Sequence, residues 1–139
     1  MKTGLLKEMK YDRLKVVIYK NNEEVGKTAA EETAKAIKIA IDNKKIANIM
    51  IATGNSQLSF LKELREINGI SWGAVNIFHM DEYLDLPAGH SASFLHYLQK
   101  NFLSYINGYT FFPVPGHSQN VENACKGYEY LLRAHPLDI

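Results

Sequence analysis

Residues 47–56 read ANIMIATGNS, a short apolar run that ends abruptly in a polar turn containing glycine. An apolar run of this length, bounded by turn residues, is typical of a buried β-strand. Apolar residues then recur at helical spacing and predict the inner face of a helix, formed by Leu58, Leu61, Leu64 and Ile67. The segment therefore predicts a strand–turn–helix unit, from which parallel sheets are built.

The same alternation extends toward the N-terminus. Leu14–Tyr19 (LKVVIY) is short and β-branched, which predicts another buried strand. Asn22 is expected to cap a long amphipathic helix that runs to about Asn43, with glutamates favourably placed in its first turn. Many small residues on the apolar face of this helix predict close packing against the sheet.

Toward the C-terminus, two more strand–helix pairs are expected. Residues 74–78 and 110–114 predict strands, and Ser91 and Asn120 are expected to cap the helices that follow them. Residues 136–139 (PLDI) resemble the entry to a further strand, so we expect the sheet to be incomplete at residue 139. Strands that alternate with helices predict an α/β fold, with a mainly parallel sheet covered on both faces and one domain over residues 1–139.

The overall composition excludes several classes of protein. Hydrophobic residues make up 46% of the chain, too many for a disordered tail. The formal net charge is +1, and without a run of Lys and Arg there is no electrostatic case for nucleic-acid binding. The sequence contains no apolar run long enough to cross a membrane, and the charged residues 1–13 do not read as a signal peptide. The single cysteine, Cys125, excludes an internal disulfide and is expected to be buried, which fits a cytoplasmic protein.

Two polar segments follow strands, at the edge where parallel sheets bind ligands. In the first, residues 52–57 (ATGNSQ), Gly54 allows the backbone to approach a ligand, and the next helix presents free N–H groups that favour a phosphate. Asn55 and Ser56 add short polar side chains to this loop. The alternative is an ordinary strand-to-helix turn in which Ser56 caps the helix.

The second segment, residues 79–83 (HMDEY), has adjacent carboxylates directly after a strand. A partly desolvated carboxylate there can act as a general base, and the alternative is a solvated acidic loop. Because the two segments come from neighbouring elements, we expect them to form one crevice, with a phosphate cradle beside a carboxylate. The histidines show no metal-ligand spacing, so no metal site is expected.

Residues 78–87 (FHMDEYLDLP), followed by residues 90–94 (HSASF), resemble the MDEY-x-x-LP-x-x-H-x-x-S-[FY] segment of the glucosamine-6-phosphate deaminase family. The loop at residues 52–56 is similar to the phosphate loop of that family, at the expected distance upstream. The resemblance covers essentially the whole chain from Leu14 onward. It implies a Rossmann-like, three-layer α/β fold and, in the full-length protein, a homo-oligomer.

The resemblance also implies an activity, the conversion of glucosamine 6-phosphate to fructose 6-phosphate and ammonia without a metal or organic cofactor. It implies that Asp81 is the base that moves a proton between C2 and C1 through an enolamine. Glu82 lies beside this base and is assigned to the substrate site. The loop residues expected to bind the substrate phosphate are Thr53, Gly54, Asn55 and Ser56.

Two features depart from the family pattern. Residues 55–57 (NSQ) replace the commoner Ser-Thr-Pro, which affects side-chain contacts to the phosphate. The second family motif, G-x-G-x-[DN]-G-H-x-A-F-N-E, would begin a few residues after Ile139. It supplies the ring-opening histidine, and loss of such an acid–base catalyst costs about 10²–10⁴-fold in rate.

Two alternatives to the deaminase stay open, and a third is disfavoured. A 6-phosphogluconolactonase has the same fold and a similar phosphate loop, and a non-catalytic fragment would bind sugar phosphates without turnover. The third alternative is the effector domain of a transcriptional regulator. Only about a dozen residues precede the first expected strand, too few for the helix-turn-helix that such regulators carry.

Overall fold

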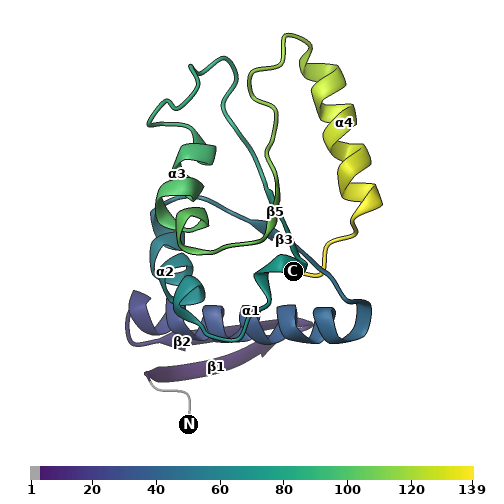
Figure 1. The fold of residues 1–139 in the computed structure, drawn as a ribbon. Helices are drawn as coiled ribbons and strands as arrows, with labels where there is room; N and C mark the ends of the chain where they lie inside the picture. The colour runs from purple at the N-terminus through teal and green to yellow at the C-terminus, as the bar shows by residue number, and fades with distance from the viewer. Residues whose placement is uncertain (1–3) are drawn as a thin grey trace.

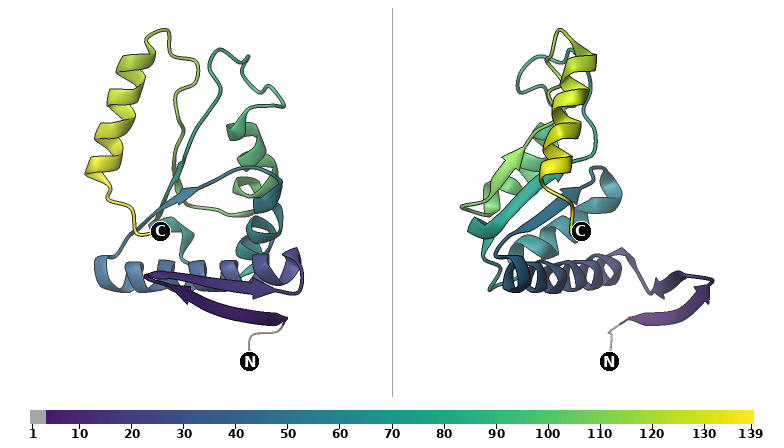
Figure 2. Two further views of the ribbon diagram at one scale, coloured as in Figure 1. Left: turned by 180° about the vertical axis from the view of Figure 1, so that it is seen from behind. Right: turned by 90° about the vertical axis from the view of Figure 1, so that its right-hand side faces the viewer.

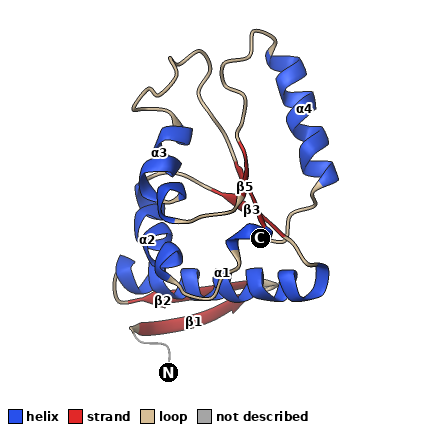
Figure 3. Cartoon of the chain, viewed as in Figure 1, coloured by secondary structure: helices blue, strands red, loops and turns tan. Residues whose placement is uncertain are grey.

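The computed structural model describes residues 4–139, and strands alternate with helices along most of this range (Figures 1 and 3). The strands are β1 (Leu5–Tyr11), β2 (Leu14–Tyr19), β3 (Ala47–Ile51), β4 (Val75–His79) and β5 (Thr110–Phe112). The helices are α1 (Asn22–Lys44), α2 (Leu58–Glu66), α3 (Phe94–Asn101) and α4 (Val121–Ala134). Short 3₁₀ turns lie at Asn55–Gln57, Trp72–Ala74 and Leu103–Tyr105.

The parallel sheet predicted from the alternation is confirmed, with the strand order β3-β4-β5. Ala47 of β3 pairs with Val75 of β4, and Ile51 pairs with His79, so these two strands begin and end side by side. Apolar residues fill the strands because helices lie on both faces of the sheet. Among residues 4–139, no helix is long and apolar enough to span a membrane.

The strand at Leu14–Tyr19 forms as predicted, but the expectation that it is buried is wrong. β2 pairs antiparallel with β1 across a two-residue turn, in which Asp12 has a φ of 52°, and the hairpin is a separate sheet. Leu14 is 64% exposed and Ile18 41% exposed. The physical reason is that residues 5–11 offer β2 a partner nearby in the sequence, which needs only a tight turn. Figure 2 (right) shows this hairpin projecting beyond the end of α1, away from the parallel sheet.

Two of the three predicted helix caps are wrong by one or two residues. α1 is capped by Asn21 rather than Asn22, and α3 is capped by Ser93 rather than Ser91. Asn120 caps α4 as predicted. At both misplaced caps the sequence offers two chemically equivalent residues, and the packing of the helix body decides which of them lies at the end.

The two faces of the parallel sheet are covered unequally. Side chains alternate along a strand, so Ile49, Val75 and Ile77 share one face, where they are buried against α1, α2 and α3. Small residues of α1 allow close approach to α2 on this side, since a Cβ added to Gly26 would lie 2.6 Å from the hydroxyl oxygen of Ser59. We call this side the closed face.

The opposite side, which we call the open face, carries Phe78 and Phe112 with their rings stacked at 4.7 Å. Tyr128 and His135 contact this pair from the α4 side. No residue of α4 is fully buried, and Cys125 is exposed, which contradicts the expectation of a buried thiol. The cysteine lies on the apolar face of an amphipathic helix, but here this face borders a cleft instead of a core.

Residues 136–139 lie beside β3 and extend the sheet by backbone hydrogen bonds, although they do not form a regular strand. The N–H of Asp138 donates to the carbonyl of Asn48 at 2.8 Å, and the N–H of Met50 donates to the carbonyl of Ile139 at 2.9 Å. The interpretation of this segment as the entry to a further strand agrees with these contacts.

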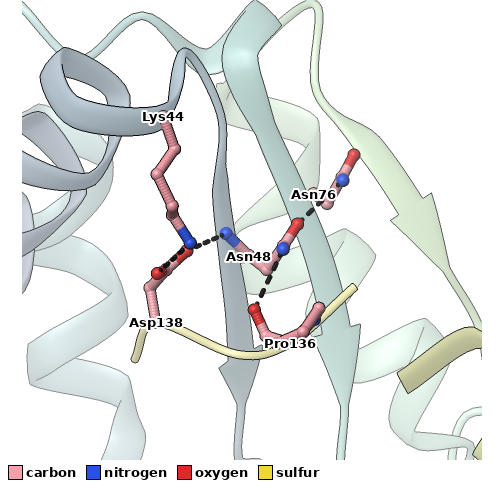
Figure 4. Close-up of polar contacts among 5 residues, drawn as sticks. All are labelled: Lys44, Asn48, Asn76, Pro136 and Asp138. Atoms are coloured by element: carbon pink, nitrogen blue, oxygen red, sulfur yellow. Dashed lines mark hydrogen bonds and ion pairs between the residues drawn. The ribbon is translucent and has the colours of Figure 1, made fainter. Parts of the chain in front are cut away.

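Buried polar groups fix the position of this segment (Figure 4). The side-chain amide of Asn48 donates to the carbonyl of Pro136 at 3.0 Å and accepts from the side chain of Asn76 at 2.9 Å. The carboxylate of Asp138 accepts from the backbone N–H of Asn48 at 2.9 Å and pairs with Lys44 at 2.5 Å. Burial raises the pKa of Asp138, but these two partners outweigh it and hold the pKa below its usual value.

Candidate functional site

The two polar segments singled out in the sequence leave the parallel sheet at the same edge. β3 ends at Ile51 and β4 ends at His79, and these two residues are paired. The loops that follow them start at the carboxyl edge, where parallel sheets bind ligands. Figure 1 shows the long loop after β4 extending from this edge before it returns to α3.

The loop after β3 is open at its glycine. Gly54 has a φ of 110° and a ψ of 169°, a backbone conformation that residues other than glycine rarely adopt. A Cβ added there would meet no atom within 4 Å, so the backbone can be approached from solvent. Asn55 and Ser56 are exposed, and Thr53 is half-buried. Ser56 does not cap α2, so the alternative of a turn capped by Ser56 is wrong.

The adjacent carboxylates after β4 have different surroundings. Asp81 is exposed, whereas Glu82 is half-buried at the N-terminus of α3. Both Glu82 oxygens accept hydrogen bonds, from the backbone N–H groups of Tyr83, Phe94 and Leu95 and from the hydroxyl of Ser93, at 2.8–3.0 Å. Burial raises the pKa of Glu82, but these donors together hold it below its ordinary value. The expected role of Glu82 in substrate binding stays a prediction.

His79 lies at the end of β4 and is fully buried. Its Nε2 accepts from the backbone N–H of Val114 at 2.7 Å, so the neutral ring carries its proton on Nδ1. Within residues 4–139 this Nδ1 has no hydrogen-bond partner. The pKa of His79 is below its ordinary value, because burial lowers it by more than the nearby carboxylates of Glu82 and Asp81 raise it. The histidine is therefore a neutral anchor for residue 114 rather than a cation.

Two tyrosines join elements around the site. The hydroxyl of Tyr97, on α3, donates to the carbonyl of Gly54 at 2.6 Å. The hydroxyl of Tyr128, on α4, lies 3.0 Å from the carbonyls of both His79 and Phe112, at the ends of β4 and β5. Sequence reasoning missed both contacts, because a tyrosine at helical spacing predicts only that its ring faces inward.

The two predicted loops are thus connected through α3. Glu82 binds the first turn of this helix, and Tyr97, one turn further, binds the glycine loop. Both loops start at the same sheet edge and are attached to α3; that they form one crevice, with a phosphate cradle beside a carboxylate, stays a prediction. The partners of Glu82 at the start of α3 lie 11–13 residues further along the chain, and the sequence carries no signal for this capping contact.

Two cavities flank the loop after β4. A cleft of about 300 Å³ is lined mostly by apolar residues of this loop, of residues 114–116 and of α4. A second cavity of about 240 Å³ lies beside Glu82 and is lined also by His96, Gln99 and His117. Neither of these two cavities includes residues 52–57. Among residues 4–139, His, Cys, Asp and Glu side chains do not gather in a group that could hold a metal ion.

Comparison with known proteins gives relatives along most of the chain. The family described as glucosamine-6-phosphate isomerases/6-phosphogluconolactonase matches residues 20–138. A glucosamine-6-phosphate deaminase of Caenorhabditis elegans is 31% identical over 125 residues, covering 86% of this chain and 47% of the relative. A deaminase of the same name from Bacillus cereus is 27% identical over 126 residues, covering 91% of this chain and 46% of the relative.

Solved structures agree with this result. A monomeric glucosamine-6-phosphate deaminase superposes with a TM-score of 0.74 at 25% identity, over 82% of this chain and 48% of that one. A 6-phosphogluconolactonase from Shewanella baltica gives a TM-score of 0.74 at 19% identity, over 85% and 50%, which is a likeness of fold alone. These likenesses confirm the Rossmann-like α/β fold, and the chain spans about half the length of the curated relatives it matches. Because the family match extends from residue 20 to residue 138, the chain belongs to the glucosamine-6-phosphate isomerase/6-phosphogluconolactonase family.

Proposed function

We propose that this chain supplies the phosphate loop and the general base of a glucosamine-6-phosphate deaminase. The reaction converts glucosamine 6-phosphate and water to fructose 6-phosphate and ammonia. One observation carries the proposal: an exposed carboxylate, Asp81, and an open glycine loop leave the same edge of a parallel sheet and are connected through α3.

In this proposal the glycine loop binds the substrate phosphate. Gly54 leaves the backbone open, and the start of α2 follows directly, with no acidic side chain in its first turn to repel an anion. Asn55 and Ser56 offer exposed side-chain donors beside these N–H groups. A phosphate held there would orient the other end of the sugar toward the loop after β4.

Asp81 then acts on the carbon chain. Its carboxylate takes the proton from C2 of the open-chain amino aldehyde, which gives an enolamine, and a proton is returned to C1 to give the C2 imine of the ketose. Water adds to C2 of the resulting ketose imine, and ammonia leaves. Positioned proton transfer of this kind contributes about 10²–10⁴-fold to a rate. Ring opening is assigned to residues of the second family motif.

A second candidate is 6-phosphogluconolactone hydrolysis, because the family includes lactonases and the Shewanella baltica enzyme has the same fold. Both reactions need a phosphate loop at this sheet edge, but only the deaminase needs a base at C2. Binding of sugar phosphates without turnover is the third candidate. We also keep two sequence expectations as proposals, a cytoplasmic location and a homo-oligomeric full-length protein, although one solved relative is described as monomeric.

The test compares Asp81→Asn with Asp85→Asn, because both aspartates are exposed in the same loop. Ammonia and fructose 6-phosphate are measured with glucosamine 6-phosphate as substrate, and binding of the same sugar is measured by calorimetry. We expect Asp81→Asn to reduce turnover at least about 100-fold with nearly unchanged binding, and Asp85→Asn to change neither.

Three other outcomes would contradict the proposal or favour another function. Equal loss of binding and turnover in Asp81→Asn would contradict the general-base role. Lactone hydrolysis without ammonia release would favour the lactonase. Binding without either reaction would leave the chain as a sugar-phosphate-binding protein.

A further inference from the structure

We propose that α3 positions the base relative to the phosphate loop, with Glu82 and Tyr97 as the positioning residues at its two points of attachment. Glu82 holds the loop that carries Asp81, and Tyr97 holds Gly54. This inference rests on the proposed function, because it concerns the geometry between Asp81 and residues 53–56.

The first attachment is made by the Glu82 carboxylate. Oε1 accepts from the N–H groups of Tyr83 at 2.9 Å and Phe94 at 3.0 Å, and Oε2 accepts from the N–H of Leu95 at 2.9 Å and the hydroxyl of Ser93 at 2.8 Å. The first N–H groups of a helix have no partner within the helix, and a carboxylate is favoured there by the helix dipole. Glu82 therefore ties its own loop to the start of α3, and both of its oxygens are used in doing so.

The backbone on either side of Asp81 is fixed by other contacts. Before it, His79 is buried and accepts the N–H of Val114. After it, the N–H of Asp85 donates to the carbonyl of Gly116 at 3.0 Å. A Cβ added to Gly116 would lie 2.5 Å from the carbonyl oxygen of Tyr83, so the two segments are in close contact. Asp81 is thus an exposed side chain on a restrained backbone, which is the arrangement that precise catalysis requires.

The second attachment is the hydroxyl of Tyr97. Its ring packs against the buried cluster of the closed face, and its hydroxyl donates to the carbonyl of Gly54 at 2.6 Å. Burial raises the pKa of Tyr97, so the hydroxyl stays protonated and remains a donor at neutral pH. The carbonyl of Gly54 also accepts from the N–H of Gln57 at 3.0 Å. Tyr97 therefore holds the peptide from which the Asn55–Gln57 turn starts.

A helical turn is a rigid spacer, and Ser93 and Tyr97 are separated by one turn. Glu82 and Tyr97 consequently fix the loop of the base and the loop of the phosphate to the same short helix. Misplacement of a reacting group by about 1 Å can cost about 100-fold in rate, so loosening either attachment should reduce turnover more than it reduces stability.

The experiment uses the full chain in four variants. Tyr97→Phe removes only the hydroxyl, and Tyr105→Phe is its matched control on an exposed tyrosine. Glu82→Gln weakens the attachment to α3, and Ser93→Ala removes one of its donors in case Glu82→Gln does not fold. Hydrogen exchange of residues 54–57 and 93–95 is measured together with kcat and KM for glucosamine 6-phosphate.

We expect Glu82→Gln to lower kcat by about 10–100-fold with KM within about 3-fold, and Tyr97→Phe to raise KM by about 3–10-fold. Exchange of residues 54–57 should rise about 10-fold in Tyr97→Phe and also rise in Glu82→Gln, although Glu82 does not contact them. Ser93→Ala should follow Glu82→Gln with a smaller effect, and Ser93→Thr, which keeps the hydroxyl, should restore it. Tyr105→Phe should change none of these quantities.

A lower melting temperature with unchanged kcat, KM and exchange at residues 54–57 would overturn the positioning role, since a purely structural contact has that signature. If the unmodified chain neither binds nor converts the sugar phosphate, the proposed function fails instead. The exchange data then decide alone. Faster hydrogen exchange of residues 54–57 in Glu82→Gln supports the α3 connection, and unchanged exchange overturns it.

Discussion

The closed and open faces of the parallel sheet differ in composition and in what covers them, because Asn48 and Asn76 lie on the open face together with Phe78. On the closed face, Ile77 of β4 is fully buried beneath three helices, together with Leu61 and Leu64 of α2. On the open face, α4 contributes no fully buried residue and borders a cleft of about 300 Å³. The alternation of side chains along a strand assigns residues to faces, but the supply of covering elements decides whether a face becomes a core. Stability should therefore depend on the closed face.

The largest expected effect is a cavity in the closed face. Leu64→Ala should lower the free energy of unfolding by about 2–5 kcal/mol, because the side chain is fully buried in α2. The same truncation on the open face, Leu132→Ala, should cost less than about 1 kcal/mol, because Leu132 lines the cleft and is half-buried. Urea denaturation of both variants tests the difference. Equal losses would show that α4 packs as tightly as α2.

The second prediction concerns the side chain that attaches residues 136–139 to the open side of β3. Asn48→Ala leaves the carbonyl of Pro136 and the side-chain amide of Asn76 without their partner. A buried polar group without a partner costs about 1–3 kcal/mol, so we expect a loss of that size and faster exchange of the Met50 N–H, which binds Ile139. Asn68→Ala, on an exposed asparagine, is the control. An unchanged Met50 exchange rate would mean that residues 136–139 hold their place without Asn48.

The third prediction is that the stability of the fold depends on pH through the buried side chain of His79. His79 has a pKa below its ordinary value because it is buried, so the unfolded chain binds the proton more readily than the folded chain. Stability should then fall as the pH drops below about 6.5, and the fall should continue to the folded pKa. The charges facing this ring, Asp81 and Glu82, only reduce the effect.

The measurement is thermal unfolding between pH 7.5 and pH 5, in His79→Gln and in the exposed-histidine control His117→Gln. Glutamine keeps an acceptor for the Val114 N–H but does not titrate, so its slope should be smaller. Each unit of pKa shift corresponds to about 1.4 kcal/mol. The same slope in both variants would mean that His79 is accessible to protons when folded.

The parallel sheet could be predicted from the sequence because its strands are short, apolar and separated by helices with clear periodicity. The place of Leu14–Tyr19 could not, because the same apolar pattern suits a buried central strand and a hairpin whose partner is close in the sequence. The prediction that Cys125 is buried was wrong because the sequence of an amphipathic helix shows which side is apolar, but not whether another element covers that side.

The candidate site likewise has features that the sequence predicts and features that it does not. The positions of Asp81 and of residues 53–56 follow from where strands end, and the sequence indicates those ends. The contacts of Glu82 and Tyr97 depend on where α3 lies, which is set by packing across more than one element. Polar side chains that bind a distant backbone group leave no periodic signal, so they are found only in the structure.

The smallest expected effect tests whether the outer side of α4 is free. Gly127 lies inside this helix, and a Cβ added to it would meet no atom within 4 Å. Glycine in a helix interior costs about 0.5–1 kcal/mol relative to alanine, so Gly127→Ala should stabilise the chain by that amount. Ala124→Gly, on the cleft side, should destabilise it by a similar amount, measured in the same urea titration. Loss of stability in Gly127→Ala would mean that another surface already contacts the outer side of α4 in solution.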